Sequence, residues 1–143
     1  MGLKVDDSDV DPNPMGELAL QTLAMPRDTN ANGDIFGGWL VSQMDLAAGI
    51  ATKKVTRGRS ATVAIKNVTF LAPVSVGSII TCYAEIIEIG RSSMHINIEV
   101  WIANSLTQHG QRKVAEGLFV FVAIDDLGRT RRIDLNGRRE GTA

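Results

Sequence analysis

The sequence predicts an α+β domain in which a curved, mainly antiparallel sheet wraps one long central helix. Three observations support this fold class. Residues 37–54 form an apolar segment without strand alternation, which indicates a helix. Four segments rich in β-branched residues follow with short links, and no further helix is available for the crossovers of a parallel sheet. The length of 143 residues, 44% of them hydrophobic, suits one globular domain.

Composition and charge exclude several classes of function. Lys and Arg total 15 against 16 Asp and Glu, so no overall field attracts nucleic acid or an anionic membrane. The single cysteine, Cys82, cannot form an internal disulfide, and no group of residues has the spacing of a metal site. The longest apolar stretch, residues 39–51, is too short to span a bilayer. We therefore expect a cytoplasmic protein that binds no nucleic acid, membrane or metal.

The two ends of the chain differ from its centre. Residues 1–14 are acidic and broken by proline, and they lack the basic and apolar regions of a secretory signal. Residues 136–143 contain two arginines and no apolar run. We expect a flexible leader over residues 1–14, a single domain over residues 15–135 and a basic flexible tail over residues 136–143.

The first strand and the helix follow the leader. Residues 16–25 form a short apolar run that stops at a proline, which is typical of a strand. Residues 26–38 are dense in Asn, Asp and Gly, and the helix starts at Gly37 within this stretch and runs to about Lys54. Because the helix is apolar nearly all round, it is expected to be buried on most of its sides. Its candidate N-caps are Thr29, Asn30, Asn32 and Asp34.

Four strands are predicted after Gly58. Alternation is clearest in the third of them, where apolar residues occupy the even positions from Met94 to Ile102. Residues 125–128, Asp-Asp-Leu-Gly, turn the chain after the last strand. Strand faces that the helix leaves uncovered need a partner, so a homodimer is the smallest expected assembly. The four predicted strands cover residues 60–70, 78–89, 94–102 and 114–124.

Asp45 is the first candidate for catalysis. It is the only ionisable side chain between Phe36 and Thr52, on a helix that is expected to be buried. A carboxylate in such a place is unfavourable unless it is paired, hydrogen-bonded or next to a water-accessible cavity. Two interpretations remain open. Asp45 either lies on a solvent-facing strip or in a salt bridge, or it faces a cavity and acts there as a general base.

The glycine pair ahead of the helix is the second candidate. Gly37 and Gly38 expose backbone N–H groups at the positive end of the helix dipole. Such groups bind a phosphate or stabilise a developing oxyanion. Alternatively, the two glycines only permit close packing and a tight entry into the helix.

Three motifs, taken in order, resemble those of one known family. They are LAMPRDTNANGDIFGGWLVSQMDLAAG, FLAPVSVGS and IGRSSMHINIEVW. Over residues 22–133 the chain resembles the YciA-type acyl-CoA thioesterases of the hotdog fold. The resemblance implies hydrolysis of an acyl-CoA thioester to a free acid and coenzyme A, a homodimer at minimum and a trimer of dimers beyond it. It implies no separate cofactor, because coenzyme A is part of the substrate.

The resemblance also implies roles for single residues. Asp45 is the catalytic base or nucleophile, and Asp34 contributes from the other subunit of the dimer. Relatives often carry asparagine at the position of Asp34. The amides of Gly37 and Gly38 hold the oxyanion. Asn30 and Asn32 either orient Asp34 or make the turn before the helix, and we favour the turn. The choice between water activation and direct attack by Asp45 stays open.

Further residues match the segments that hold coenzyme A in this family. Arg91, Ser92 and Ser93 stand at a tight strand connection, and the backbone around Val63 matches a wall of the pantetheine channel. Arg59 lies in a loop from which it can reach a phosphate. The alternatives are a hairpin turn with an exposed arginine at residue 91 and a solvated basic loop at residue 59.

A non-catalytic acyl-CoA-binding sensor of the same fold is the alternative function. Sensors of this kind usually add a DNA-binding segment, and residues 1–14 are too short and too acidic for one. A hydratase of the same fold is less consistent with the sequence, because no histidine precedes the helix or lies on it. Release of a free thiol from acyl-CoA distinguishes the enzyme from the sensor.

Overall fold

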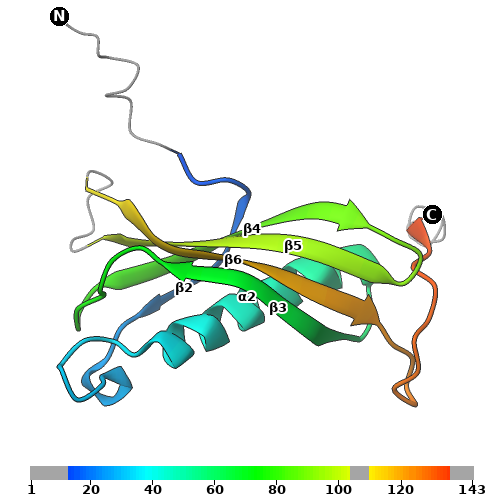
Figure 1. Cartoon of the computed structure of the whole chain (residues 1–143). Coiled ribbons are helices and arrows are strands. Elements are labelled where there is room, and N and C mark those ends of the chain that lie inside the picture. Colours follow the sequence, from blue (N-terminus) through cyan, green and yellow to red (C-terminus); the bar gives the residue numbers. More distant parts are fainter. Residues whose placement is uncertain (1–12, 104–109, 136–143) are drawn as a thin grey trace, which may run out of the picture.

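The computed structural model describes residues 13–103 and 110–135, in which one long helix packs against one antiparallel sheet (Figure 1). The helix and the short 3-10 helix before it are α2 (Gly37–Thr56) and η1 (Pro26–Asp28). The strands are β2 (Glu17–Leu23), β3 (Ser60–Phe70), β4 (Ile79–Ile89), β5 (Ser93–Ala103) and β6 (Arg112–Ala123). All predicted strands and the predicted helix are present. The proposed leader and tail lie outside the described residues, apart from residues 13 and 14.

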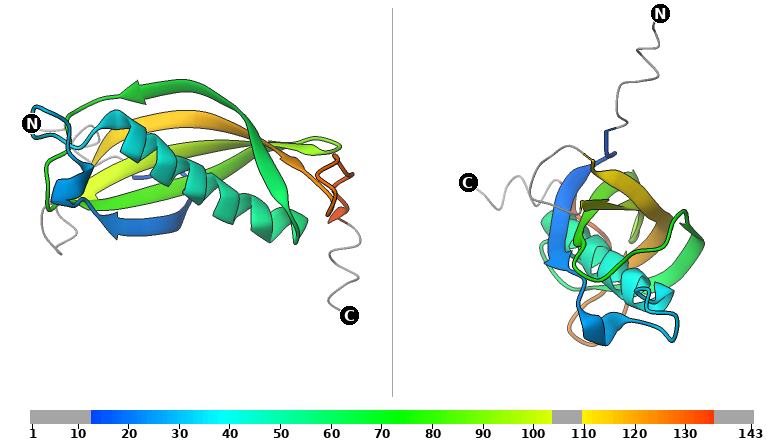
Figure 2. Two further views of the ribbon diagram at one scale, coloured as in Figure 1. Left: turned by 90° about the horizontal axis from the view of Figure 1, so that it is seen from below. Right: turned by 90° about the vertical axis from the view of Figure 1, so that its left-hand side faces the viewer.

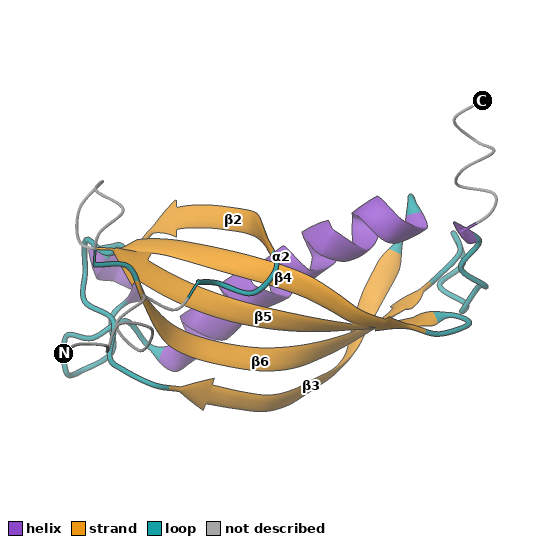
Figure 3. Cartoon of the chain, turned by 90° about the horizontal axis from the view of Figure 1, so that it is seen from above, coloured by secondary structure: helices purple, strands orange, loops and turns teal. Residues whose placement is uncertain are grey.

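The five strands are arranged in the order β2-β4-β5-β6-β3, and every neighbouring pair is antiparallel (Figure 3). The antiparallel sheet expected from the sequence is therefore confirmed. β2 and β3 form its two edges, although they flank α2 in the sequence. The sheet curls so that its concave side faces the helix, as the two views of Figure 2 show. This is the wrapped helix that the sequence predicts.

The core lies between α2 and the concave face of the sheet. The helix contributes one stripe at a spacing of three to four residues, formed by Leu40, Met44, Ala48 and Thr52 with Ala47 beside it. The sheet contributes alternating side chains, of which those on β5 are Met94, Ile96, Ile98, Val100 and Ile102. Small side chains at positions 47 and 48 let the helix lie close to the strands.

Most of α2 is buried or half-buried, as the sequence predicts, but one stripe is exposed in the described part of the chain. Leu46 is 56% exposed and Ile50 is 41% exposed on this stripe, which is turned away from the core stripe. All five strands of the sheet contact the helix, and they leave this stripe open. An exposed apolar stripe of this kind is typical of a surface that meets another subunit.

The outer face of the sheet carries a buried carboxylate. Glu99 on β5 accepts hydrogen bonds from Trp101 Nε1 at 2.9 Å and from the backbone N–H of Met15 at 3.2 Å. Its other oxygen lies 3.7 Å from Lys113 Nζ. Each of these contacts offsets the free-energy cost of burying the charge. The segment ahead of β2 is thereby held against the sheet.

Gly49 provides a test of how tightly α2 is packed. A Cβ atom at this position would meet only Phe121 Cε2, at 3.8 Å, which is ordinary van der Waals contact. Alanine is favoured over glycine in a helix interior by about 0.5–1 kcal/mol. Gly49→Ala is therefore expected to raise the free energy of unfolding by about that amount, measured by urea denaturation. As a control, Gly117→Ala is expected to lower it, because its Cβ would lie 2.9 Å from Val68 Cγ2.

Cys82 provides a test of the integrity of the core. Burial raises the pKa of this thiol from 9.0 to about 12, so it stays protonated at neutral and mildly alkaline pH. At pH 8 the native protein is expected to leave a thiol-specific reagent unreacted, and protein unfolded in guanidinium is expected to react with one equivalent of it. Rapid labelling of the native protein would contradict the buried position. Stability is expected to fall as the pH rises above 9.0, because only the unfolded state then loses this proton.

Candidate active site

Asp45 lies on the flank of α2 that faces the edge strand β3. Its side chain is half-buried, and its Oδ1 accepts a hydrogen bond of 2.7 Å from Thr62 Oγ1. A cavity of about 490 Å³ opens beside it, lined by α2 between Asp45 and Lys53, by the start of β3 and by Phe121. The structure shows a half-buried, hydrogen-bonded carboxylate beside an open cavity, and the role of Asp45 as a general base stays a prediction.

A bulge in β3 places Thr62 opposite Asp45. Thr62 pairs with Phe121 and Ala64 pairs with Val120, so Val63 is an extra residue in the strand. Val63 is 57% exposed, and among the described residues β3 has no neighbouring strand on its outer side. The sequence analysis missed Thr62, because a threonine in a strand carries no signal of the partner that it meets across the sheet.

The loop before α2 is organised by Asn30. Its Oδ1 accepts hydrogen bonds from the N–H groups of Asn32 at 2.8 Å and Asp34 at 3.2 Å, while its own N–H donates to Asp34 O at 2.7 Å. The predicted turn role of Asn30 is confirmed. Asp34 is half-buried and lines a second cavity of about 530 Å³, together with Asn30, Gly37 and the chain around residues 70–74.

The start of α2 differs from the sequence prediction. The N-cap is Phe36, not any of the four polar candidates, and a phenylalanine side chain cannot accept a hydrogen bond. The N–H groups of Trp39 and Leu40 both reach Phe36 O, at 3.1 and 3.4 Å. The first amides of the helix are thus not capped by a side chain. The turn made by Asn30 keeps the polar residues outside the helix, which is why the prediction was wrong.

Gly37 and Gly38 lie close to two aromatic side chains. A Cβ on Gly37 would lie 3.0 Å from Phe70 Cζ, and a Cβ on Gly38 would lie 3.0 Å from Phe36 Cε2. These tight contacts support the packing interpretation of the pair, which stays a prediction because both phenylalanine side chains are exposed and can shift. An oxyanion-binding role for the same amides is compatible with it and stays a prediction.

The candidate catalytic groups are separated along α2 within one chain. Gly37 and Asp45 are eight residues apart, which is about 12 Å along the helix axis. They also line different cavities, the first shared with Asp34 and the second with Thr62. A single chain therefore does not gather all these groups around one small reacting centre.

Of the candidate coenzyme A residues, those at the turn of Arg91 lie near the C-terminal end of α2, whereas Val63 lies near its middle. Arg91, Ser92 and Ser93 form and follow the turn between β4 and β5, and the Arg91 residue is exposed. The carbonyl oxygens of Arg91 and Ser92 accept hydrogen bonds of 2.8 Å from the N–H groups of Ile133 and Ala123. These bonds fix the turn against the end of β6 and the segment after it.

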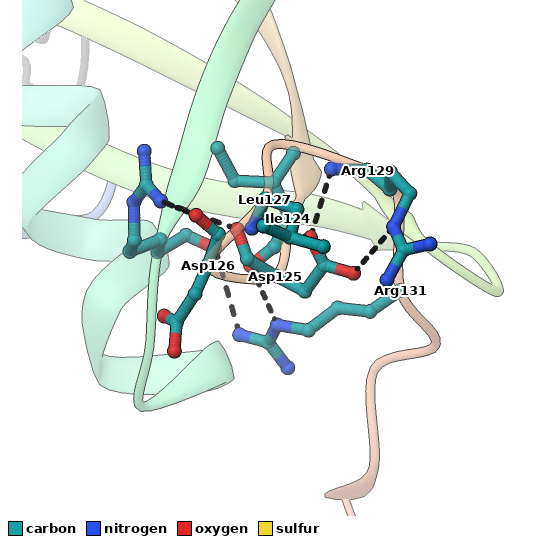
Figure 4. A network of polar contacts seen from close by, with 7 residues as sticks. Ile124, Asp125, Asp126, Leu127, Arg129 and Arg131 are labelled. Atoms are coloured by element: carbon teal, nitrogen blue, oxygen red, sulfur yellow. Dashed lines mark hydrogen bonds and ion pairs between the residues drawn. The ribbon is translucent and has the colours of Figure 1, made fainter.

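Arg59 binds the backbone of the turn that follows β6. Figure 4 shows this turn, with Asp125, Arg129 and Arg131 among its labelled residues. Arg59 Nη1 donates to the carbonyl oxygens of Asp125 and Asp126 at 3.2 and 3.1 Å, and Arg131 Nε donates to Ile124 O at 2.9 Å. The N–H of Arg129, followed by that of Leu127, holds the pKa of the Asp125 carboxyl below its usual range. Arg59 thus stabilises this turn by hydrogen bonds and is not a freely solvated side chain.

Two further classes of site are absent from residues 13–103 and 110–135. No helix in these ranges is long and apolar enough to cross a membrane. The same ranges contain no group of three or more His, Cys, Asp or Glu side chains placed to hold a metal ion.

Comparison with known proteins identifies the family. The family model described as the thioesterase superfamily matches residues 32–108. The acyl-CoA thioester hydrolase YciA of Salmonella typhimurium is 50% identical over 130 residues, which are 90% of this chain and 98% of that protein. The YciA protein of Escherichia coli is 51% identical over 122 residues, covering 84% of this chain and 92% of that protein.

Solved structures agree with the sequence comparison. A hexameric thioesterase from Yersinia pestis superposes with a TM-score of 0.80 at 49% identity, covering 85% of this chain and 99% of that one. A hexameric hotdog fold thioesterase of Campylobacter jejuni has a TM-score of 0.80 at 34% identity, covering 92% and 100%. This chain belongs to the thioesterase superfamily and, within it, to the YciA acyl-CoA thioester hydrolases of the hotdog fold.

Proposed function

We propose that Asp45 is the carboxylate with which this chain hydrolyses acyl-CoA thioesters to a free acid and coenzyme A. The reaction follows from membership of the YciA family, whose members match nearly the whole chain. The observation that supports Asp45 is its position: a half-buried carboxylate, hydrogen-bonded by Thr62 at 2.7 Å, at the edge of a cavity. We propose a cytoplasmic location, since the only cysteine, Cys82, is free and buried.

Two routes are open to the Asp45 carboxylate. As a general base it removes a proton from water, the hydroxide adds to the thioester carbonyl, and the C–S bond breaks to release the thiolate of coenzyme A, which takes up the proton. As a nucleophile it forms a mixed anhydride and expels the thiolate, and water then hydrolyses the anhydride. In both routes the hydrogen bond from Thr62 orients one carboxylate oxygen and leaves the other for the reaction.

The complete site is proposed to need two subunits. The amides of Gly37 and Gly38 and the carboxylate of Asp34 lie too far from Asp45 in the same chain to meet one thioester carbonyl. In a symmetric pair, the start of α2 in one subunit supplies these groups to Asp45 of the other, and each dimer has two equivalent sites. The relatives from Y. pestis and C. jejuni are hexameric, which supports a trimer of such dimers here.

Coenzyme A is proposed to extend from Asp45 along the outer edge of β3 toward the turn of Arg91. The free edge of β3 at Val63 offers backbone groups to the amides of the pantetheine arm. Arg91 presents an exposed guanidinium to the phosphates, with Ser92 and Ser93 beside it. Arg59 already donates from Nη1 to two carbonyl oxygens, which leaves its Nε and Nη2 groups for a phosphate, so we assign it the smaller share of binding.

Replacing the carboxylate tests the assignment of Asp45. Asp45→Asn keeps the shape of the side chain and removes its basicity, so kcat is expected to fall by at least about 100-fold. Binding of acyl-CoA, measured by calorimetry, is expected to be largely retained. The assay is release of free thiol from a panel of acyl-CoA esters, with Glu17→Gln, exposed on β2, as the charge-matched control. Full turnover in Asp45→Asn would contradict the assignment, and binding without thiol release in wild type would support the sensor.

Replacing Thr62 tests whether its hydrogen bond positions Asp45. Thr62→Val has nearly the same shape but no donor, and kcat is expected to fall by about 10- to 100-fold with little change in KM. Thr62→Ser restores a hydroxyl and is expected to recover most of the activity. Equal losses in the two variants would point to packing, not to the hydrogen bond.

Mixed oligomers test the two-subunit site. Asp45→Asn and Asp34→Ala are each expected to have low activity alone. In a dimer of one of each, one site is expected to contain the wild-type Asp45 and Asp34 together, while the other has neither. Refolding an equal mixture is therefore expected to restore about a quarter of the wild-type sites. Recovery no greater than the sum of the separate variants would place both residues in one chain.

A further inference from the structure

Gly49 lies one helical turn beyond Asp45 in the wall of the same cavity. The spacing of four residues puts the two positions on one face of α2. Both positions line the cavity of about 490 Å³, opposite the start of β3 and next to Phe121. A side chain at residue 49 would therefore project into the space beside the candidate catalytic carboxylate.

Neither the backbone nor the packing requires glycine at this position. Gly49 is not among the described glycines with positive φ, so its backbone conformation is open to any residue. A Cβ there would make only an ordinary contact with Phe121, at 3.8 Å, whereas one on Gly37 would lie 3.0 Å from Phe70. Glycine in a helix interior also disfavours the helix relative to alanine. What the glycine provides is unfilled space next to Asp45.

We propose that Gly49 is a specificity-determining position, which leaves room beside Asp45 for the acyl chain of the substrate. Around Gly49 the wall of this open cavity is apolar on one side, formed by Leu46, Ile50 and Phe121, while Lys53, Ser60 and Thr62 stand at its polar side. The apolar side favours contact with a hydrocarbon chain over water or a charged group. The size of the side chain at residue 49 thus sets how long an acyl group is accepted. This inference rests on the hydrolysis of acyl-CoA at Asp45.

The test is a comparison of substrate profiles between wild type, Gly49→Ala and Gly49→Leu. kcat and KM are measured for straight-chain acyl-CoA esters from acetyl to palmitoyl. In Gly49→Leu, kcat/KM for the long chains is expected to fall at least about 10-fold, while that for acetyl-CoA stays within about 3-fold of wild type. For the long chains, kcat/KM of Gly49→Ala is expected to lie between the values of wild type and Gly49→Leu. Gly49→Ala is also expected to have a raised Tm, so the test remains valid if Gly49→Leu folds poorly.

Ser42→Leu is the matched control, because Ser42 is exposed on the same helix and does not line this cavity. It is expected to keep the wild-type chain-length profile, and sedimentation is expected to show the same assembly for every variant. Three results would overturn the inference: an unchanged profile in both Gly49 variants, an equal loss for all chain lengths, or a loss of assembly that accounts for the lost activity.

Different results would show that this inference is wrong and that the proposed function is wrong. If wild type releases no thiol, or if Asp45→Asn keeps full turnover, the proposed function is wrong. If turnover depends on Asp45 while the Gly49 variants keep the wild-type preference, only the role of Gly49 is wrong.

Discussion

The packing of one stripe of α2 into the concave face of the sheet determines where each candidate site residue lies. Met44 and Ala48 are buried in that stripe, so the next residue after Met44 must point to a flank of the helix. That residue is Asp45, and the flank faces the edge strand β3. Because a curved sheet covers only one side of a helix, the stripe also decides which apolar residues, Leu46 and Ile50, stay uncovered.

A carboxylate on the flank of a packed helix needs a polar partner, and the edge strand supplies it. The bulge at Val63 lets Thr62 point to Asp45 while the strand continues along β6. An edge strand can accommodate such an irregularity because it has a neighbour on one side only. The same feature that orients the carboxylate therefore leaves free backbone groups next to it, where a substrate with amide groups can bind.

The described site is distributed along the roughly 30 Å of α2. Uncapped amides and Asp34 lie at its start, Asp45 near its middle, and the turn of Arg91 at its end. In the proposed two-subunit site, a symmetric partner would bring the start of one helix to the middle of the other, so that each pair would have two complete sites. The uncovered apolar face of α2 is consistent with this arrangement. Catalysis would then require assembly.

The sequence by itself determined the order and type of the elements, because helical and strand periodicities are local properties that can be recognised without knowing the tertiary structure. It also singled out Asp45, since a lone charge in an apolar segment is visible without coordinates. Only the tertiary structure decided the partners of those residues. Thr62 meets Asp45, and Arg59 meets the carbonyls of Asp125 and Asp126, across separations in sequence that no local pattern encodes. The N-cap at Phe36 was likewise decided by the loop that Asn30 closes, not by helix propensity.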